Sequence, residues 1–305
     1  MRSAITVLVI VILTVVLTSS AFEARANEDL TFGAWTIGNP APGHLLAVHS
    51  TLLRNGKILV VGGSSFNESF AWGKEEARLY DIATGTWSAP LSSPAPYGTD
   101  KDAFCSSHAH DNTGGVIFQG GLLGYGNLNG HGVPNSARYE PGGGFTPITG
   151  GTAHWYPTLV AGVNDIFIFP GRDTNSGENI EKLTYGTTAW TSTGVIARTQ
   201  ATYPRVALLP NGTFFVASPA LDDRKNYVFD PGTNTLSLAG NDVVPESEPG
   251  GVHNDSSWKG SGVLLPLVPS VGSYPQMRFA LINGVNAWVK DLGQANPVGS
   301  RVEFA

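Results

Sequence analysis

Two short segments carry the residues whose types and spacing are best suited to chemistry. The first, Phe104–His108 (FCSSH), contains Cys105, the single cysteine of the chain. The second, His154–Pro157 (HWYP), contains Tyr156. Each segment opens a sequence repeat at about the same place, so neighbouring repeats would bring Cys105 and Tyr156 side by side. This pairing of a thiol with a phenol is the sharpest chemical indication in the sequence.

Histidines offer a second kind of chemistry. His108 and His110 are two residues apart and therefore share one face of a strand. Together with Asp111 they would form a metal site. His154 immediately precedes the Trp155–Tyr156 pair and is a candidate to line the same site as Tyr156. For His108 and His110 the alternative is a structural role as hydrogen-bonded loop or core residues. For His154 the alternative is a stacked or solvent-facing side chain.

The segments that would position these residues are repeats of four short strands. In the first repeat, residues 49–63 form an apolar strand, an Asn55–Gly56 turn, a second apolar strand and a glycine pair. Asn-Gly between apolar runs predicts a hairpin with a type I′ turn, which needs positive φ at both central residues. A third strand and a fourth strand that holds Trp87 complete the repeat. The same order returns four times, beginning near residues 104, 155, 203 and 260.

Four short strands in about 50 residues is the period of kelch repeats, the blades of a β-propeller. Blades arranged radially bury both faces against their neighbours and leave only short sheet edges. We therefore predict an all-β, kelch-type β-propeller with about five recognisable four-stranded blades. The last repeat lacks a tryptophan-bearing fourth strand, and residues 31–36 have the character of such a strand. The chain is either a five-bladed ring closed by that segment or a larger propeller without its carboxyl-terminal blades.

The amino-terminal residues predict export. A basic residue is followed by an apolar run over residues 4–17 and by the small-x-small sequence Ala24–Ala26. Residues 1–26 are therefore interpreted as a signal peptide and residues 27–305 as the propeller domain. The apolar run is shorter than the roughly 20 residues of a membrane span; an uncleaved signal anchor is the alternative. We expect a secreted or periplasmic protein with no stable membrane span after cleavage.

Composition agrees with a turn-rich β-protein. The chain has 38 glycines and 20 prolines, and its charged residues amount to 14%, against about 25% in typical domains. Its net charge is −6, and it has no basic run, which argues against nucleic acid as a partner. A lone cysteine in an exported chain has no internal disulfide partner. It is buried and inert, bonded to another molecule, or used chemically.

Several segments together resemble the galactose oxidase and glyoxal oxidase family of copper-radical oxidases. They are Phe104–His108, Trp155–Thr158, Tyr203–Pro204 and Leu208–Gly212. The similarity extends over most of the chain, from about residue 45 to residue 292. It implies a seven-bladed kelch propeller, of which this chain would be a truncated form. It also implies oxidation of an alcohol or aldehyde, or of a carbohydrate, by O2 with release of H2O2.

The resemblance also assigns roles to individual residues. Cys105 would form a thioether with Tyr156, and Tyr156 would bind copper and carry the radical. The family's Tyr–His pair and its last histidine have no counterpart, because after Gly260 the chain has one tyrosine, Tyr274, followed by Pro275, and no histidine. Full oxidase activity is therefore expected only if a longer gene product supplies these ligands. The alternative is a non-catalytic propeller that binds carbohydrate or a cell-surface protein.

Overall fold

The computed structural model divides the chain into two units, Met1–Pro40 and Ala41–Ala305. The residues that it describes are 37–42, 45, 47–63, 77–91, 102–122, 132–171, 179–197, 202–217, 225–241, 261–267, 277–283, 286–292 and 300–302. The expected signal peptide over residues 1–26 and the outer strand over residues 31–36 lie outside these ranges. Within the described residues, no helix is long and apolar enough to cross a membrane.

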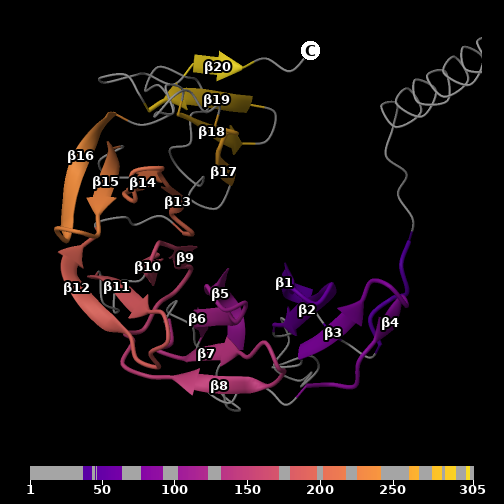
Figure 1. Cartoon of the computed structure of the whole chain (residues 1–305). Coiled ribbons are helices and arrows are strands. Elements are labelled where there is room, and N and C mark those ends of the chain that lie inside the picture. The colour runs from indigo at the N-terminus through magenta and orange to yellow at the C-terminus, as the bar shows by residue number, and fades with distance from the viewer. Residues whose placement is uncertain are drawn as a thin grey trace, which may run out of the picture. The chain divides into compact units, whose positions relative to one another are not determined.

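The described strands form five antiparallel sheets of four strands each, and each sheet is one blade of a β-propeller arrangement (Figure 1). The first two blades are β1 (Ala47–Leu52), β2 (Lys57–Gly62), β3 (Ala77–Asp81) and β4 (Thr86–Trp87), then β5 (Asp102–His110), β6 (Val116–Leu122), β7 (Ser136–Tyr139) and β8 (Phe145–Ile148). The third is β9 (Thr158–Ala161), β10 (Asp165–Phe169), β11 (Asn179–Thr184) and β12 (Thr191–Ile196).

The remaining two blades follow the same order. They are β13 (Arg205–Leu208), β14 (Phe214–Ala217), β15 (Lys225–Asp230) and β16 (Thr235–Asn241), then β17 (Ser261–Leu264), β18 (Arg278–Asn283), β19 (Asn286–Asp291) and β20 (Ser300–Val302). The innermost strands β1, β5, β9, β13 and β17 contact one another in sequence order. The predicted all-β propeller with five four-stranded blades is therefore confirmed.

The apolar core consists of clusters that join successive blades. Leu59 and Phe118 meet between blades one and two, and Ile117 and Ile166 meet between blades two and three. Since side chains alternate along a strand, Ile117 and Phe118 on β6 face opposite neighbours. This explains why the second strand of each blade is apolar on both faces.

Two further clusters continue the series. Phe167 and Phe214 meet between blades three and four, and Phe215 and Phe279 meet between blades four and five. The aromatic rings of the Phe167–Phe214 pair lie 5.0 Å apart in an edge-to-face arrangement, a favourable geometry for two π-systems. Every pair of successive blades is thus held by an apolar contact.

The tight turns of the inner hairpins differ from the predicted type. In the β1–β2 turn, Gly56 alone has a positive φ of 76°, and Asn55 does not. The N–H of Gly56 donates to the carbonyl of Leu53, and the N–H of Leu53 donates to the carbonyl of Lys57. This is a type I turn closed by one left-handed glycine, a common three-residue hairpin loop. The prediction of a type I′ turn was therefore wrong, because one glycine suffices here.

The fifth blade is completed by a strand that the sequence did not reveal. β20 pairs with β19, with Val302 opposite Ala287 and Ser300 opposite Val289. The last repeat therefore has a fourth strand, although not a tryptophan-bearing one, in agreement with the sequence. β20 is three residues long and carries no tryptophan, so it lacks the feature that marked the fourth strand of the first repeat.

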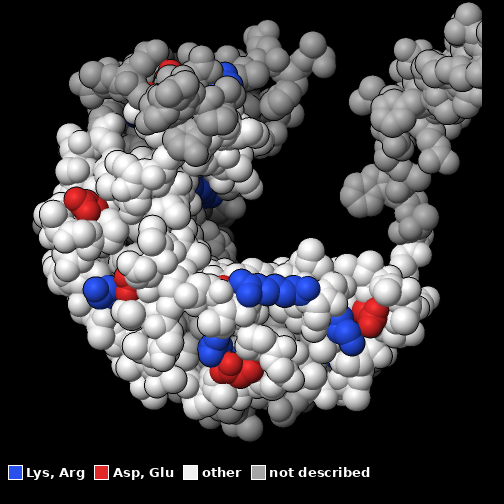
Figure 2. Space-filling model, in the orientation of Figure 1, with Lys and Arg blue, Asp and Glu red and all other residues white. Residues whose placement is uncertain are grey.

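Charged side chains are sparse and of both signs on the face shown in Figure 2. Lys57 and Asp81 pair at 3.3 Å between β2 and β3. Arg138 on β7 pairs with Asp111 at 2.7 Å and with Glu140 at 2.9 Å. Each of these ion pairs therefore joins residues of a single blade.

Candidate functional site

Three residues near the start of successive blades have the same unusual backbone conformation. Cys105, Tyr156 and Tyr203 have φ values of 67°, 53° and 51°, in the left-handed region. Cys105 lies in β5 at an irregularity of its pairing with β6, and the two tyrosines each lie two residues before an innermost strand. A non-glycine residue in this conformation costs about 1–2 kcal/mol. Such strain persists only where the surroundings enforce it.

Backbone hydrogen bonds join these three residues across three blades. The N–H of Tyr156 donates to the carbonyl of Cys105 at 3.0 Å, and the N–H of Tyr203 donates to the carbonyl of Tyr156 at 2.8 Å. The rings of Tyr156 and Tyr203 meet edge to face, with centroids 5.1 Å apart. The left-handed conformation thus turns each residue toward its counterpart in the neighbouring blade. Cys105 and Tyr156 lie side by side, as the spacing of the repeats indicated.

The side chains of Cys105 and Tyr156 pack in one buried cluster with Leu122, and Phe104 and Trp155 lie against it. Cys105 is 1% exposed and Tyr156 is 9% exposed. Cys105 is the single cysteine of the chain and so has no partner for an internal disulfide, and the ring of Trp155 lies 4.7 Å from that of Tyr156. A thiol and a phenol therefore share a largely apolar setting from which water is excluded.

Glycines allow other backbone segments to approach the Tyr156 turn. A Cβ atom added at Gly171, which follows β10, would lie 2.0 Å from the carbonyl oxygen of Tyr156 and 2.3 Å from that of Trp155. A Cβ atom added at Gly120 would lie 2.8 Å from the carbonyl oxygen of His154. Both distances are too short for a side chain, so glycine is required on either side of the turn.

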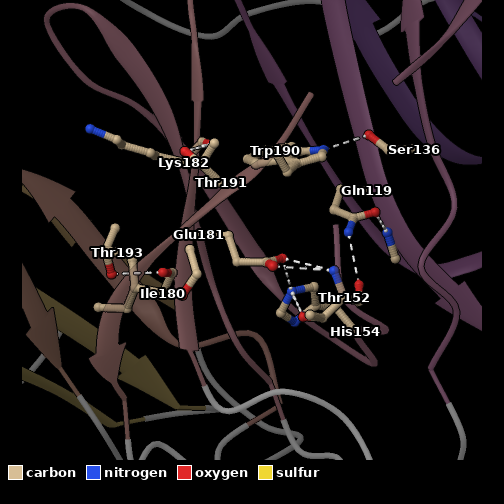
Figure 3. Close-up of polar contacts among 12 residues, drawn as sticks. Gln119, Ser136, Thr152, His154, Ile180, Glu181, Lys182, Trp190, Thr191 and Thr193 are labelled. Carbon is tan, nitrogen blue, oxygen red and sulfur yellow. Dashed lines mark hydrogen bonds and ion pairs between the residues drawn. The ribbon is translucent and has the colours of Figure 1, made fainter. Parts of the chain in front are cut away.

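His154 is neither stacked nor solvent-facing, contrary to the structural alternative expected for it. Its side chain is fully buried and its Nε2 atom lies 2.8 Å from Oε2 of Glu181, which is itself 2% exposed (Figure 3). Because a carboxylate only accepts hydrogen bonds, Nε2 carries the hydrogen. The Nδ1 atom of His154 has no hydrogen-bond partner among the described residues.

His108 and His110 lie against the first blade. Nδ1 of His108 is 3.2 Å from Nδ1 of His49 on β1, and Nε2 of His110 is 2.7 Å from the hydroxyl of Thr51. Burial, and then the positive charge of His49 and of His110, lowers the pKa of His108 from 6.5 to about 4. His108 is therefore neutral near pH 7 and serves the contact between blades one and two.

Asp111 has a structural role in the turn between β5 and β6. Its carboxylate accepts hydrogen bonds from the backbone N–H groups of Thr113 and Gly115 and pairs with Arg138. These hydrogen bonds, together with the charge of Arg138, outweigh the desolvation of the carboxyl group and lower its pKa. The structural alternative for His108 and His110 is thus the one observed. The metal site considered for these two residues with Asp111 is not formed, and no metal-binding group was found among the described residues.

The described residues do not fit a copper ion at Tyr156. Cu(II) prefers a tetragonal set of nitrogen and oxygen donors, with imidazole prominent. The described residues around Tyr156 offer two phenols, those of Tyr156 and Tyr203, and one thiol among apolar and indole side chains. No group of three or more His, Cys, Asp or Glu residues in the described ranges is arranged to hold a metal ion. Further ligands would have to come from outside the described part of the chain.

Sequence reasoning missed two residues of the site. Tyr203 appeared in the sequence analysis only as part of a motif. The pair Tyr203–Pro204 repeats the pair Tyr156–Pro157, and this repetition could have identified Tyr203 as the equivalent of Tyr156 in the next blade. Glu181 was not singled out. Its only sequence signal is that it is the single carboxylate in the mixed polar and apolar sequence of β11 (NIEKLT).

Comparison with known proteins adds information on the fold. No family model matches the chain, and no curated protein sequence matches it. A solved structure of a fungal alcohol oxidase, described as catalytically diverse within the AA5 family and in complex with copper, matches with a TM-score of 0.60 and 18% identity. That match covers 88% of this chain and 56% of the oxidase. The solved structure of YjhT matches with a TM-score of 0.49 and 12% identity, over 83% of each chain.

The TM-score of the match to the fungal oxidase shows a shared fold. The chain spans about half the length of the fungal oxidase that it matches. Its five blades are therefore similar to part of a copper alcohol oxidase.

Proposed function

We propose that this chain is the propeller part of an exported oxidase of the copper-radical type, in which Cys105 and Tyr156 form a thioether cofactor. The observation that carries the proposal is the paired geometry of these residues. Both have left-handed backbones, and the N–H of Tyr156 bonds to the carbonyl of Cys105. Their side chains share one buried cluster. The fold shared with a copper alcohol oxidase supports the same class of reaction.

Formation of the thioether is a balanced two-electron oxidation. The thiol of Cys105 loses its hydrogen, and the ring of Tyr156 loses one hydrogen beside the hydroxyl group. A carbon–sulfur bond forms between the two residues. The two electrons and two protons pass to dioxygen, which becomes H2O2. Burial of both side chains favours this bond over oxidation of Cys105 by solvent species, because susceptibility of a thiol follows its exposure.

The residues of this chain would hold and shield the cofactor. Trp155 lies against the ring of Tyr156 on one side, and Tyr203 meets it edge to face. Tyr203 is 39% exposed, so a small alcohol, aldehyde or carbohydrate would reach the site past this residue. Oxidation of such a substrate by O2 would yield H2O2, with the remaining metal ligands supplied from beyond the described residues.

Intact mass of the purified protein tests the proposal. Protein produced without added copper is incubated with Cu(II) in air and compared with the untreated sample. A thioether removes two hydrogen atoms, about 2 Da, since such cofactors are made from the protein's own side chains. The wild type should lose this mass and resist alkylation of Cys105 after denaturation. Cys105→Ser and Tyr156→Phe should keep their full mass.

An unchanged mass, with Cys105 freely alkylated in the denatured protein, would overturn the proposal. The chain would then be better described as a propeller that binds carbohydrate or a cell-surface protein. Peptide mapping distinguishes the expected product from simple thiol oxidation, because only the thioether links the Cys105 and Tyr156 peptides.

A further inference from the structure

The segment from Thr152 to Tyr156 is fixed at several successive points. The backbone N–H of His154 donates to the carbonyl of Val133, and its carbonyl accepts from the N–H of Gly121. Two residues later, the N–H of Tyr156 donates to the carbonyl of Cys105. The segment is thus held by blade two on one side, and its left-handed turn at Tyr156 is enforced by its surroundings.

Glu181 holds the same segment from blade three. Its carboxylate accepts the backbone N–H of Thr152 at 3.2 Å and 3.1 Å and the Nε2–H of His154 at 2.8 Å (Figure 3). The hydroxyl of Thr152 lies 3.2 Å from the same Nε2 atom. From blade two, the side-chain amide of Gln119 donates to the carbonyl of Thr152 at 3.1 Å.

A buried carboxylate is expensive unless its oxygens are hydrogen-bonded. Glu181 satisfies its oxygens with donors that all come from the Thr152–His154 stretch. Hydrogen bonds to a charged group contribute more to stability than bonds between neutral groups. The carboxylate therefore has its strongest described contacts with the chain that leads directly into Tyr156.

We propose that Glu181 is the positioning residue for Tyr156. Through Thr152 and His154, its carboxylate holds the left-handed turn that packs the ring of Tyr156 over Cys105. The importance of this placement for catalysis rests on the proposed function. The placement itself can be tested without copper, because Cys105 is the single thiol of the chain and is buried in the same cluster as Tyr156.

Alkylation of Cys105 under native conditions measures how often the turn opens. Copper-free protein is treated with iodoacetamide at several urea concentrations below the unfolding transition, and the labelled fraction is followed by intact mass. Local opening gives a labelling rate that is insensitive to urea, whereas global unfolding gives one that rises steeply with urea. The two kinds of opening are therefore separable.

Glu181→Gln keeps the shape of the side chain but has only one accepting oxygen. That oxygen can replace Oε2, which accepts from both the Thr152 N–H and the His154 Nε2–H, but both bonds are then made to a neutral group and the contact of Oε1 with the Thr152 N–H is lost. We expect the urea-independent labelling rate to rise about 10- to 100-fold, because two hydrogen bonds to a charged group become weaker bonds to a neutral one. Thr152→Val removes only the hydroxyl contact to His154 and should raise the same rate about two- to fivefold. This milder variant keeps the test available if Glu181→Gln does not fold.

Asp111→Asn provides the matched control. Asp111 is a half-buried carboxylate that also accepts several hydrogen bonds, but it lies in the turn between β5 and β6. Its loss should raise only the urea-dependent labelling. The inference would be overturned if Glu181→Gln behaved like Asp111→Asn, or left the urea-independent rate within twofold of the wild type. A wild type that forms no thioether but shows the Glu181 effect would overturn the proposed function alone.

Discussion

At the scale of single residues, the left-handed backbone of Cys105, Tyr156 and Tyr203 is the feature that most sets the site apart. In tight turns the residue with a positive φ is usually glycine, as at Gly56 and Gly212. In the site, a cysteine and two tyrosines adopt this conformation, at an energetic cost. The neighbouring blades offset that cost by bonding the turned backbone. Strained residues with reactive side chains are typical of functional sites.

The pKa of His108 leads to a prediction about acid stability. It is lowered from 6.5 to about 4, first by burial and then by the charges of His49 and His110. The unfolded chain therefore binds this proton more readily than the folded chain does. The stabilising contribution is complete above pH 6.5 and is lost as the pH falls through 4. At about 1.4 kcal/mol per pKa unit, the shift from 6.5 to about 4 corresponds to a loss of roughly 3–4 kcal/mol.

Urea unfolding at pH 7 and at pH 4.5 measures this effect. The wild type should lose more stability between the two values than His108→Gln, which cannot take up the proton. The expected difference is about 2 kcal/mol at pH 4.5. Parallel losses in the two proteins would show that His108 does not govern the acid response.

At the scale of elements, the sequence predicted the strands better than the contacts between them. The repeats located four-stranded blades because apolar runs and Asn-Gly turns are local signals. β20 was missed because a strand of three residues without tryptophan has no local signal. Cys105 and Tyr156 could be paired because equivalent positions in neighbouring repeats lie side by side. The hydrogen bond between His154 and Glu181 could not be predicted from the sequence, because it depends on how β11 packs against the segment before β9.

The glycine beside the Tyr156 turn gives a prediction at this scale. In Gly171→Ala, the new Cβ atom would lie 2.0 Å from the Tyr156 carbonyl oxygen, which is backbone and cannot rotate away. The turn must shift, at a cost of about 1–3 kcal/mol in the free energy of unfolding. Because the turn covers Cys105, alkylation of that thiol in the native state should also become faster.

Gly142→Ala is the matched control, because nothing lies within 4 Å of a Cβ atom at this turn position. Its unfolding free energy should stay within about 0.5 kcal/mol of the wild type. Urea unfolding of both variants, with iodoacetamide labelling below the transition, makes the comparison. Equal behaviour of the two variants would mean that the approach of Gly171 to the turn is not critical.

At the scale of the whole molecule, stability is distributed between successive blades. The second, third and fourth blades each contribute residues to two of the apolar clusters. The fifth blade contributes Phe279 and Leu281 to the cluster that it shares with the fourth. On the other face of this blade, Val263 and Ile282 are exposed by 49% and 38%. Among the described residues, the fifth blade is thus supported mainly from one side.

Removal of one side chain should therefore uncouple the fifth blade from the others. Phe279 is fully buried, and its ring lies 5.1 Å from that of Phe215. Phe279→Ala removes this contact at a cost of about 3–5 kcal/mol. When stability consists of contacts between neighbours, such a loss falls mainly on the unit at the end of the series. Hydrogen exchange followed by mass spectrometry should show β17, β18 and β19 losing protection while β10 and β14 keep theirs.

Phe167→Ala gives the comparison in a cluster between inner blades. Phe167 contacts Phe214 and Phe229, and blades three and four each also contact another neighbour. Its loss should lower protection across β9–β16 together, because neither blade can open without disturbing the next. If Phe279→Ala also lowered protection evenly across all five blades, the blades would unfold as one cooperative unit. Contacts between neighbours would then not suffice to describe the stability of this propeller.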